Sequence, residues 1–340
     1  MLSHILRELP VLSLRTRSRP HTVLSSRVQR GICFCLLAGT ILFIGVPFIT
    51  FLEKTHAAEK EPRRPHIFGI ARVRILSTDV PAARAFYRKL LGKADDCHWC
   101  EDVPGLSFPV SYSQGIVLSP APSPSPTNLI EEITFATDDV GELRRYFKAH
   151  KVAVSNPHKP EDNYLNVADP EGHRIGFLTS RAIVPPTSEQ ALDTMFPLRI
   201  IHAGFVVRDR DAEDRFYKDL LGFHVYWHGG MKDGEDNWVD MQVPDGTDWI
   251  EYMLKVSPNA DKRELGVMNH FAIGVDKISS RIEQLRQDGV VPILDEPKIG
   301  RDGKWQLNLY DPDDTRVEFM EFTPVQKPCC SEFTGPHPKP

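Results

Sequence analysis

The sequence lacks an excess of positive charge, and it lacks the compositional bias of a fibrous or disordered chain. Its 340 residues include 41 Lys and Arg against 46 Asp and Glu, a formal net charge of −5. A nucleic-acid-binding protein usually shows a basic stripe, so we expect no nucleic-acid partner. Hydrophobic residues make up 41% and charged residues 26%, which excludes a collagen-like, coiled-coil or wholly disordered chain. At about 150 residues per domain, the length predicts two globular domains and one additional segment.

The additional segment is a run from residue 31 to residue 52 that contains no charged residue. It is long enough to cross a bilayer as a helix, and the basic region 1–30 before it carries six arginines against one acid, Glu8. Because positive flanks stay in the cytoplasm, we expect a single-pass anchor with the remaining chain outside, in a bacterial inner membrane facing the periplasm. The alternative is a cleaved signal peptide, with small residues around Ala57, and a secreted product.

Cysteines occur in pairs. Cys97 and Cys100 form a Cys-His-Trp-Cys motif, and Cys329 and Cys330 are adjacent in the tail. The first motif does not open a helix after a strand, as a thioredoxin-like redox motif does. In an oxidising compartment, a structural disulfide or unreactive thiols are the favoured interpretation.

The chain contains an internal repeat. LSTDVPAARAFYRKLLGK (76–93) is similar to VVRDRDAEDRFYKDLLGF (206–223), and the shared Phe-Tyr-basic-x-Leu-Leu-Gly recurs 130 residues later. A second pair is ADPEGHRIGF (168–177) and YDPDDTRVEF (310–319). The repeating unit is therefore a whole domain of about 120 residues.

The repeat defines a domain organisation. We expect one domain over 66–180, a linker over 181–198, a second domain over 199–323 and a disordered Pro-rich tail over 324–340. In each copy, a strand, an amphipathic helix and three strands follow one another twice. One helix for every three strands indicates an α+β fold with four βαβββ modules.

The second copy carries a set of possible metal ligands on strand-like segments. In RIIHAGFVV and NHFAIGV, alternation places His202 and His270 beside very small residues on the same face. In RVEFMEF, Glu318 faces away from its apolar neighbours, and Glu251 interrupts the apolar run DWIEYMLKV. A carboxylate in a core-like strand needs a cation or hydrogen-bond donors. Two imidazoles and one or two carboxylates are a plausible divalent metal site, although each residue alone is also compatible with a structural role.

Over residues 66–323 the sequence resembles the vicinal oxygen chelate superfamily, which includes glyoxalase I, bleomycin-resistance proteins and extradiol dioxygenases. The resemblance rests on FYKDLLGF, NHFAIGVDK and LYDPDDTRVEF. It implies half-open barrels of paired βαβββ modules around one divalent metal ion, either Zn²⁺, Ni²⁺ or Fe²⁺. The ligands would be His202, His270 and Glu318, with Glu251 as a fourth, and the substrate a small molecule with vicinal oxygens. The family builds such sites within one chain or across a dimer, so a homodimer is possible.

Three functions follow from this resemblance. A glyoxalase I-like lyase or isomerase uses the ligand order His, Glu, His, Glu, which Glu251 supplies, and Glu318 or Glu251 would move the proton. An extradiol Fe(II) dioxygenase has two domains and an inert first one, as the layout here suggests. A resistance-type protein would bind a small molecule without catalysis, although such proteins often lack the ligands.

The sequence departs from both enzyme patterns. Glutathione-dependent glyoxalases have an Arg where Val206 stands and an Asn where Lys255 stands, so a glutathione thioester is a doubtful substrate. Extradiol dioxygenases use an additional His before the final Glu, and KIGRDGKWQLNLYDP contains none, with Tyr310 as its one tyrosine.

The first copy repeats the fold pattern without the ligands. Arg72, Glu132 and Gly176 occupy the positions of His202, His270 and Glu318. One acid without imidazoles is a poor metal site, so we expect a structural role for this copy.

Overall fold

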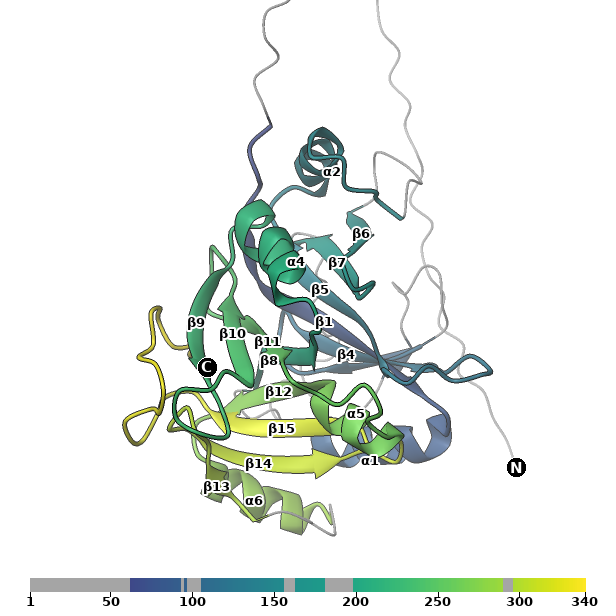
Figure 1. Ribbon diagram of the computed structural model, residues 1–340. Coiled ribbons are helices and arrows are strands. Elements are labelled where there is room, and N and C mark those ends of the chain that lie inside the picture. Colours follow the sequence, from purple (N-terminus) through teal and green to yellow (C-terminus); the bar gives the residue numbers. More distant parts are fainter. Residues whose placement is uncertain (1–61, 93–94, 97–104, 156–162, 181–197, 290–295) are drawn as a thin grey trace, which may run out of the picture. The chain divides into compact units, whose positions relative to one another are not determined.

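The computed structural model describes residues 62–92, 95–96, 105–155, 163–180, 198–289 and 296–340 (Figure 1). All of them belong to a compact unit over Ala58–Pro340. The expected anchor 31–52, the Cys97–Cys100 motif and nearly all of the expected linker lie outside the described residues. Within the described ranges, no helix has the length and apolar character needed to cross a membrane.

The first copy forms a seven-stranded sheet with two helices. Its strands lie in the order β2-β3-β4-β1-β5-β7-β6. The elements in chain order are β1 (Ile67–Ser77), α1 (Val80–Leu91), β2 (Asp95–Asp96), β3 (Leu106–Pro109), β4 (Gly115–Pro120), β5 (Ile130–Thr137), α2 (Val140–Ala149), β6 (Tyr164–Ala168) and β7 (Arg174–Thr179).

The second copy forms an eight-stranded sheet in the order β13-β14-β15-β12-β8-β11-β10-β9. The elements are β8 (Arg199–Val206), α4 (Arg210–Asp214), the π-helix η2 (Arg215–Leu220), β9 (His224–Gly229), β10 (Trp238–Gln242), β11 (Trp249–Met253), α5 (Lys262–Met268), β12 (His270–Val275), α6 (Ile278–Gln287), β13 (Lys298–Ile299), β14 (Trp305–Tyr310) and β15 (Arg316–Glu321).

Both sheets join two modules through their first strands. β1 pairs antiparallel with β5, and β8 pairs antiparallel with β12. The last strand of each module then pairs parallel with its first strand, as β11 does with β8 and β15 with β12. This mixed α+β architecture with two curled sheets is the predicted one. It places the first and last strands of a module side by side, where the expected ligands lie.

One module differs from the predicted strand–helix–three-strand pattern. After α2 the structure has two strands, β6 and β7, and the remaining position is a single bridge between Val154 and Val167. The residues that follow, 156–162, lie outside the described part of the chain.

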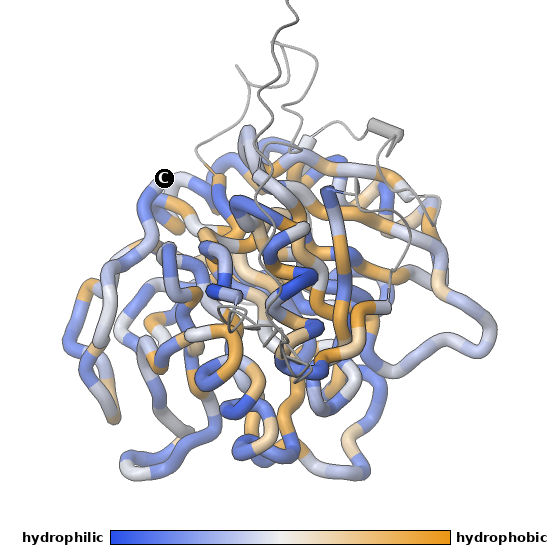
Figure 2. Tube along the Cα trace, turned by 90° about the horizontal axis from the view of Figure 1, so that it is seen from above, coloured by the Kyte–Doolittle hydropathy of each residue, from blue (hydrophilic) through white to orange (hydrophobic). Residues whose placement is uncertain are grey.

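Aspartate side chains cap the starts of three helices, and the longer helices pack an apolar face into the core. The side chains of Asp79, Asp139 and Asp209 cap α1, α2 and α4 by accepting backbone N–H bonds. Each long helix buries one apolar face, as α1 does with Tyr87 and Leu90. Figure 2 shows hydrophobic residues along the strands in the interior and hydrophilic residues in the surrounding loops.

The repeated sequence motifs bind one another across the two copies. The Tyr87 hydroxyl, in the first Phe-Tyr motif, donates to Asp311 of the second Asp-Pro motif at 3.0 Å. The Tyr217 hydroxyl, in the second Phe-Tyr motif, donates to Asp169 of the first Asp-Pro motif at 3.1 Å. All four residues are buried. We call these two junctions the reciprocal latches.

A second acid strengthens each latch. Asp313 accepts hydrogen bonds from the Thr78 backbone N–H at 2.9 Å and from the Ser77 hydroxyl at 2.6 Å. Glu171 accepts from the backbone N–H groups of Arg208 and Asp209 at 2.6 and 2.7 Å. Each Asp-Pro turn therefore holds the start of a helix in the other copy, which gives the repeated motifs a structural function.

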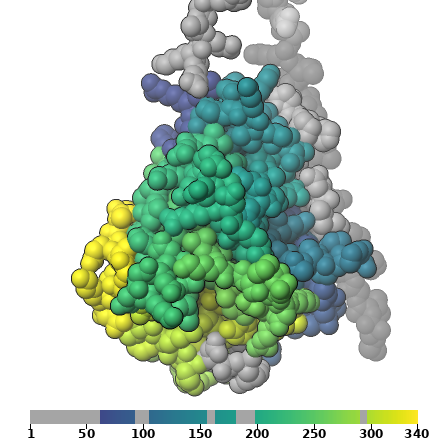
Figure 3. Space-filling model, in the orientation of Figure 1, coloured from purple at the N-terminus to yellow at the C-terminus, as the bar shows by residue number. Residues whose placement is uncertain are grey.

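The C-terminal tail differs from the expected disordered segment. Residues 324–340 pack along β9, where the Thr334 N–H donates to the Tyr226 carbonyl at 3.0 Å and the Ser331 hydroxyl to the His228 carbonyl at 3.0 Å. The tail begins against the β13–β14 turn, where the Val325 N–H donates to the Gly303 carbonyl at 2.9 Å. Figure 3 shows the yellow C-terminal residues against the green second copy. Prolines do not prevent this docking because the tail needs few donors of its own.

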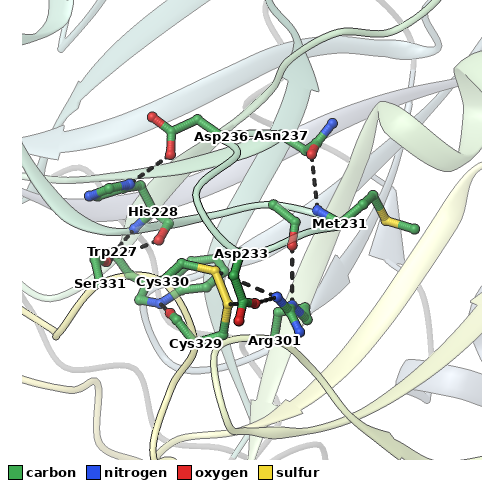
Figure 4. The surroundings of a disulfide bond; sticks show 11 residues. Trp227, His228, Met231, Asp233, Asp236, Asn237, Arg301, Cys329, Cys330 and Ser331 are labelled. Atoms are coloured by element: carbon green, nitrogen blue, oxygen red, sulfur yellow. Dashed lines mark hydrogen bonds and ion pairs between the residues drawn. A yellow bond between two sulfur atoms is a disulfide. The ribbon is translucent and has the colours of Figure 1, made fainter.

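Cys329 and Cys330 form a disulfide with each other (Figure 4). The Cys329 carbonyl accepts a hydrogen bond from the Trp227 indole at 3.1 Å, and its N–H donates to the Arg301 carbonyl at 2.8 Å. Cys329 therefore binds both β9 and the β13–β14 turn.

Candidate metal centre

The four expected ligands lie in two adjacent rows that run across the second sheet. In one row, Gly204 on β8 is opposite His270 on β12 and beside Glu251 on β11. In the next row, His202 on β8 is opposite Ala272 on β12, which is beside Glu318 on β15. Four different strands therefore deliver one ligand-type side chain each to a single point.

Small residues alternate with large ones in these rows, and this creates the space that the imidazoles fill. A Cβ atom on Gly204 would lie 2.2 Å from Cε1 of His270, closer than two such atoms can approach. Glycine is therefore required for the observed position of the ring. The pairing of β12 with β8 has a register shift between Ala272 and Ile273, which interrupts the strict alternation of side chains along β8. As a result Ile201, and not Ile200, packs on the side of the sheet that carries the centre.

The ligand atoms of the four side chains are close together. Nε2 of His202 lies 3.1 Å from Nε2 of His270 and 3.8 Å from the nearest oxygens of both Glu251 and Glu318. Nε2 of His270 lies 3.0 Å from Glu251 and 3.8 Å from Glu318. Two imidazole nitrogens and two carboxylates within this distance are a donor set that suits Zn²⁺, Ni²⁺ or Fe²⁺.

The hydrogen bonds of these side chains leave ligand atoms available to bind a cation. His270 Nδ1 lies 3.0 Å from the Met268 carbonyl, and a carbonyl only accepts, so the ring proton is on Nδ1 and the Nε2 lone pair faces the centre. This is the orientation in which proteins hold metal-binding histidines. Oε1 of Glu318 is buried and has no hydrogen-bond partner among the residues that the structure describes. Such an atom is costly without a cation or donor.

Burial sets the protonation of these groups. It lowers the pKa of His202 and His270 well below the ordinary value, and the nearby Arg316 adds to this, so both rings are neutral. Burial raises the pKa of Glu251 and of Glu318 to about 7. Neutral imidazoles are the metal-binding form, and a bound cation would hold the carboxylates in their charged form.

Several charged residues around the centre do not belong to the predicted ligand set. Asp240 on β10 is opposite Glu251 on β11, and burial and the Glu251 charge raise its pKa well above the ordinary value. The sequence did contain a signal for it, because Asp240 interrupts the apolar run NWVDMQV just as Glu251 interrupts DWIEYMLKV. Lys304 and Asp302 come from a loop, where no periodicity points to burial.

These residues give the centre an excess of negative charge. It holds four largely buried carboxylates and two cationic side chains, which are Asp240, Glu251, Asp302, Glu318, Lys304 and Arg316. The cationic side chains of Lys298 and Arg301 at the cavity wall are exposed to solvent. In the buried part, carboxylates outnumber cationic groups, and buried carboxylates need a cation or hydrogen-bond donors.

Lys304 is fully buried in an aromatic cage. Its ammonium lies 4.4 Å from the Trp249 ring centre, 5.1 Å from that of Phe333 and 5.3 Å from that of Tyr226. Within the described part of the chain it has no hydrogen-bond partner. Burial lowers its pKa. Cation–π attraction stabilises an ammonium in such a cage. Trp249 in turn packs on the His202 ring at 4.9 Å, so the tail residue Phe333 supports the centre indirectly.

A cavity of about 290 Å³ opens beside the centre. Its walls include three of the ligand-type residues, three tryptophans and three cationic side chains. They are His202, Glu251, Glu318, Trp227, Trp238, Trp249, Lys298, Arg301 and Arg316. Trp238 and Trp249 thus line the cavity beside the ligand-type residues.

The corresponding place in the first copy contains an ion-pair cluster. The strand registers match Arg72 to His202, Glu132 to His270 and Gly176 to Glu318, as the repeat indicates. Glu132 is 2.7 Å from Arg174 and 3.7 Å from Arg72, and it accepts a hydrogen bond from Tyr164 at 2.6 Å. The guanidinium groups supply the positive charge there, and both oxygens of the carboxylate are engaged.

Comparison with known proteins covers both copies. A sequence model of the Glyoxalase/Bleomycin resistance protein/Dioxygenase superfamily matches residues 69–177 and 199–319. Lactoylglutathione lyase of Haemophilus influenzae is 27% identical over 125 residues, which are 36% of this chain and 93% of that enzyme.

Solved structures of extradiol dioxygenases share the fold. A substrate complex of homoprotocatechuate 2,3-dioxygenase from Brevibacterium fuscum has a TM-score of 0.55 and 21% identity, covering 81% of this chain and 84% of that one. A room-temperature structure of an extradiol ring-cleaving dioxygenase from B. fuscum has a TM-score of 0.56 and 20% identity, covering 81% and 76%. With both copies matched, the chain belongs to the Glyoxalase/Bleomycin resistance protein/Dioxygenase superfamily, also called vicinal oxygen chelate proteins.

Proposed function

We propose that the second copy binds one divalent cation through His202, Glu251, His270 and Glu318 and moves a proton between adjacent carbons of a small substrate with vicinal oxygens. The convergence of two neutral imidazoles and two carboxylates from four strands is the observation that carries this proposal. A divalent cation supplies positive charge that polarises the substrate oxygens and makes the neighbouring C–H group more acidic.

Glu251 is the better candidate for the group that moves the proton. Its side chain is 15% exposed and borders the cavity, whereas that of Glu318 is 4% exposed. When this carboxylate is not bound to the cation, burial raises its pKa to about 7, which suits a general base at neutral pH. The carboxylate takes the proton from one carbon and returns it to the adjacent carbon, so atoms and charge balance without a further reactant.

The cavity favours a small, oxygen-rich substrate. Its volume of about 290 Å³ is at the lower end of the ~300–1,000 Å³ typical of small-molecule sites. Lys298, Arg301 and Arg316 favour negatively charged or polar oxygen atoms. Val206 and Lys255 replace the Arg and Asn that the glutathione-dependent pattern requires, so we propose a substrate without glutathione.

The second candidate function is extradiol ring cleavage with Fe(II). The two-copy layout and the fold similarity to extradiol dioxygenases favour it. A set of two histidines and one carboxylate is typical of non-haem Fe(II) oxygenases, which need open positions for both substrate and oxygen. Glu251 adds a fourth protein donor, which leaves one position fewer. The donor count therefore favours proton transfer.

Metal analysis and two assays on the purified full-length chain distinguish these functions. We expect Zn²⁺ or Ni²⁺, no oxygen uptake with catechols, and exchange of a substrate proton with deuterated solvent when α-hydroxycarbonyl compounds or non-glutathione hemithioacetals are supplied. Glu251→Gln should abolish the exchange, and His202→Ala with His270→Ala should abolish metal binding. Fe(II) with oxygen uptake on a catechol would instead establish the dioxygenase function.

A further inference from the structure

A second cluster of metal-ligand-type residues lies at one reciprocal latch, away from the centre described above. Asp169 and His173 come from the β6–β7 turn of the first copy, and Glu213 comes from α4 of the second. Their potential ligand atoms all lie within 4.8 Å of one another. The carboxylate of Asp169 and the whole of Glu213 have no exposed surface, and the His173 ring packs on Phe205 with ring centres 4.3 Å apart.

The other latch shows which of these residues the junction needs. There Asp311 and Tyr87 make the same bond as Asp169 and Tyr217, and the Thr315 N–H donates to Asp311 just as the His173 N–H donates to Asp169. Thr315 stands in place of His173, and Ala83 stands in place of Glu213. The hydrogen bond between tyrosine and aspartate therefore forms without the imidazole and the second carboxyl group, so these two groups are additions that the junction itself does not require.

Glu213 also has an unused ligand atom. Its Oε1 accepts the Glu171 N–H at 3.0 Å, whereas its Oε2 is buried and accepts no hydrogen bond from a donor group of the described residues. Neither Glu213 nor Asp169 forms an ion pair with a lysine or arginine of the described ranges; the imidazole of His173, 2.8 Å from Asp169, is the one basic group paired with them. Two buried carboxyl groups beside one imidazole need either a bound cation or a proton held between them.

We propose that Asp169, His173 and Glu213 form a second divalent-cation site that joins the two copies. One nitrogen and two carboxylate oxygens are ligands that Zn²⁺ accepts, and solvent can supply the fourth position beside the partly exposed His173. The cation would compensate both carboxylates and engage Oε2 of Glu213. Since one copy contributes two ligands and the other contributes one, occupancy would stabilise the junction between them.

Zinc stoichiometry of the full-length protein tests this site separately from the first. The protein is loaded with Zn²⁺ alone, desalted and analysed for zinc per chain. We expect two ions in the wild type and one in His202→Ala/His270→Ala. We also expect one in His173→Thr/Glu213→Ala, which carries the residues of the other latch and should therefore fold. In the wild type, Zn²⁺ should raise Tm further than in this latch variant.

A matched control separates metal binding from damage to a latch. Tyr87→Phe removes the hydrogen bond of the other latch and should leave both zinc ions in place. The proposal is overturned if His173→Thr/Glu213→Ala binds as much zinc as the wild type, or if Tyr87→Phe loses as much zinc as that variant. If His173→Thr/Glu213→Ala keeps one zinc ion, that ion is the one at the main centre, and the proposed function is unaffected. The two proposals can therefore fail independently.

Discussion

Replacing Gly204 by alanine should remove metal binding from the main centre without replacing any ligand residue. The new Cβ would lie 2.2 Å from Cε1 and 2.6 Å from Nδ1 of His270. The ring cannot rotate freely, because it is fully buried and its Nδ1 is bonded to the Met268 carbonyl. Either the imidazole or the strand that carries Gly204 must move.

The required movement can be worked out from the contact. Ordinary contact begins at 3.4 Å, so the shortest approach must lengthen by 3.4 − 2.2, or about 1.2 Å. Metal–ligand distances in proteins hold within about 0.2 Å. His270 would therefore cease to be a ligand, and loss of affinity should exceed the ~10–100-fold that follows loss of a residue that merely orients a ligand. Overpacking should also cost about 1–3 kcal/mol of stability.

Gly274→Ala is the matched control, four residues along the same strand from His270. Its Cβ would lie 2.3 Å from Phe322 and 2.7 Å from Ile201, so the steric conflict is similar but involves no ligand. Metal affinity is measured by titration against a chelator, and thermal melting by circular dichroism measures stability. Gly204→Ala should lose affinity, while Gly274→Ala should lose comparable stability and keep its metal. Wild-type affinity in Gly204→Ala, or equal loss in both variants, would refute the reasoning.

Four further predictions concern other parts of the chain. Glu132→Ala removes the buried carboxylate that pairs with the buried Arg72 and with Arg174, so urea unfolding should show a loss of about 3–5 kcal/mol, with unchanged metal content. Deleting residues 324–340 removes the tail that holds Trp227 and Arg301, so steady-state kinetics should show KM rising more than kcat falls; an unchanged KM would contradict this. Burial and the Asp169 charge raise the pKa of Glu213 from 4.5 to about 8, so in chelator-treated protein the folded state keeps a proton that the unfolded state releases. The free energy of unfolding should therefore fall between these pH values by a few kcal/mol, and Glu213→Gln should flatten that dependence in pH-dependent urea titrations. Deleting residues 1–52 should move the protein from the membrane fraction to the soluble fraction; an unchanged distribution would argue against an anchor.

The sequence predicted the fold class because the repeat is strong and strand alternation is regular. It also singled out His202, Glu251, His270 and Glu318, which the structure brings together, because each is a polar residue in an otherwise apolar strand. Their roles as ligands stay predictions, as do the N-terminal anchor, the domain boundaries and a homodimer.

Other features could not be derived from sequence patterns. Burial of Lys304 depends on aromatic rings from β9, β11 and the tail, which are distant in the sequence. The tail contains many prolines and no periodicity, so its docking depends on the unpaired edge of β9. The cluster of Asp169, His173 and Glu213 arises because two motifs from different copies meet, and local patterns carry no information on that contact.

The reciprocal latches have a consequence for how the chain could have diverged. Each Phe-Tyr motif completes the Asp-Pro turn of the other copy, which is the arrangement of a two-fold symmetric dimer. In a dimer of identical subunits, every substitution occurs twice, so neither centre can lose its ligands alone. Joining the subunits into one chain removes that restriction. The first copy could then acquire Arg72 and Glu132 while the second kept its histidines.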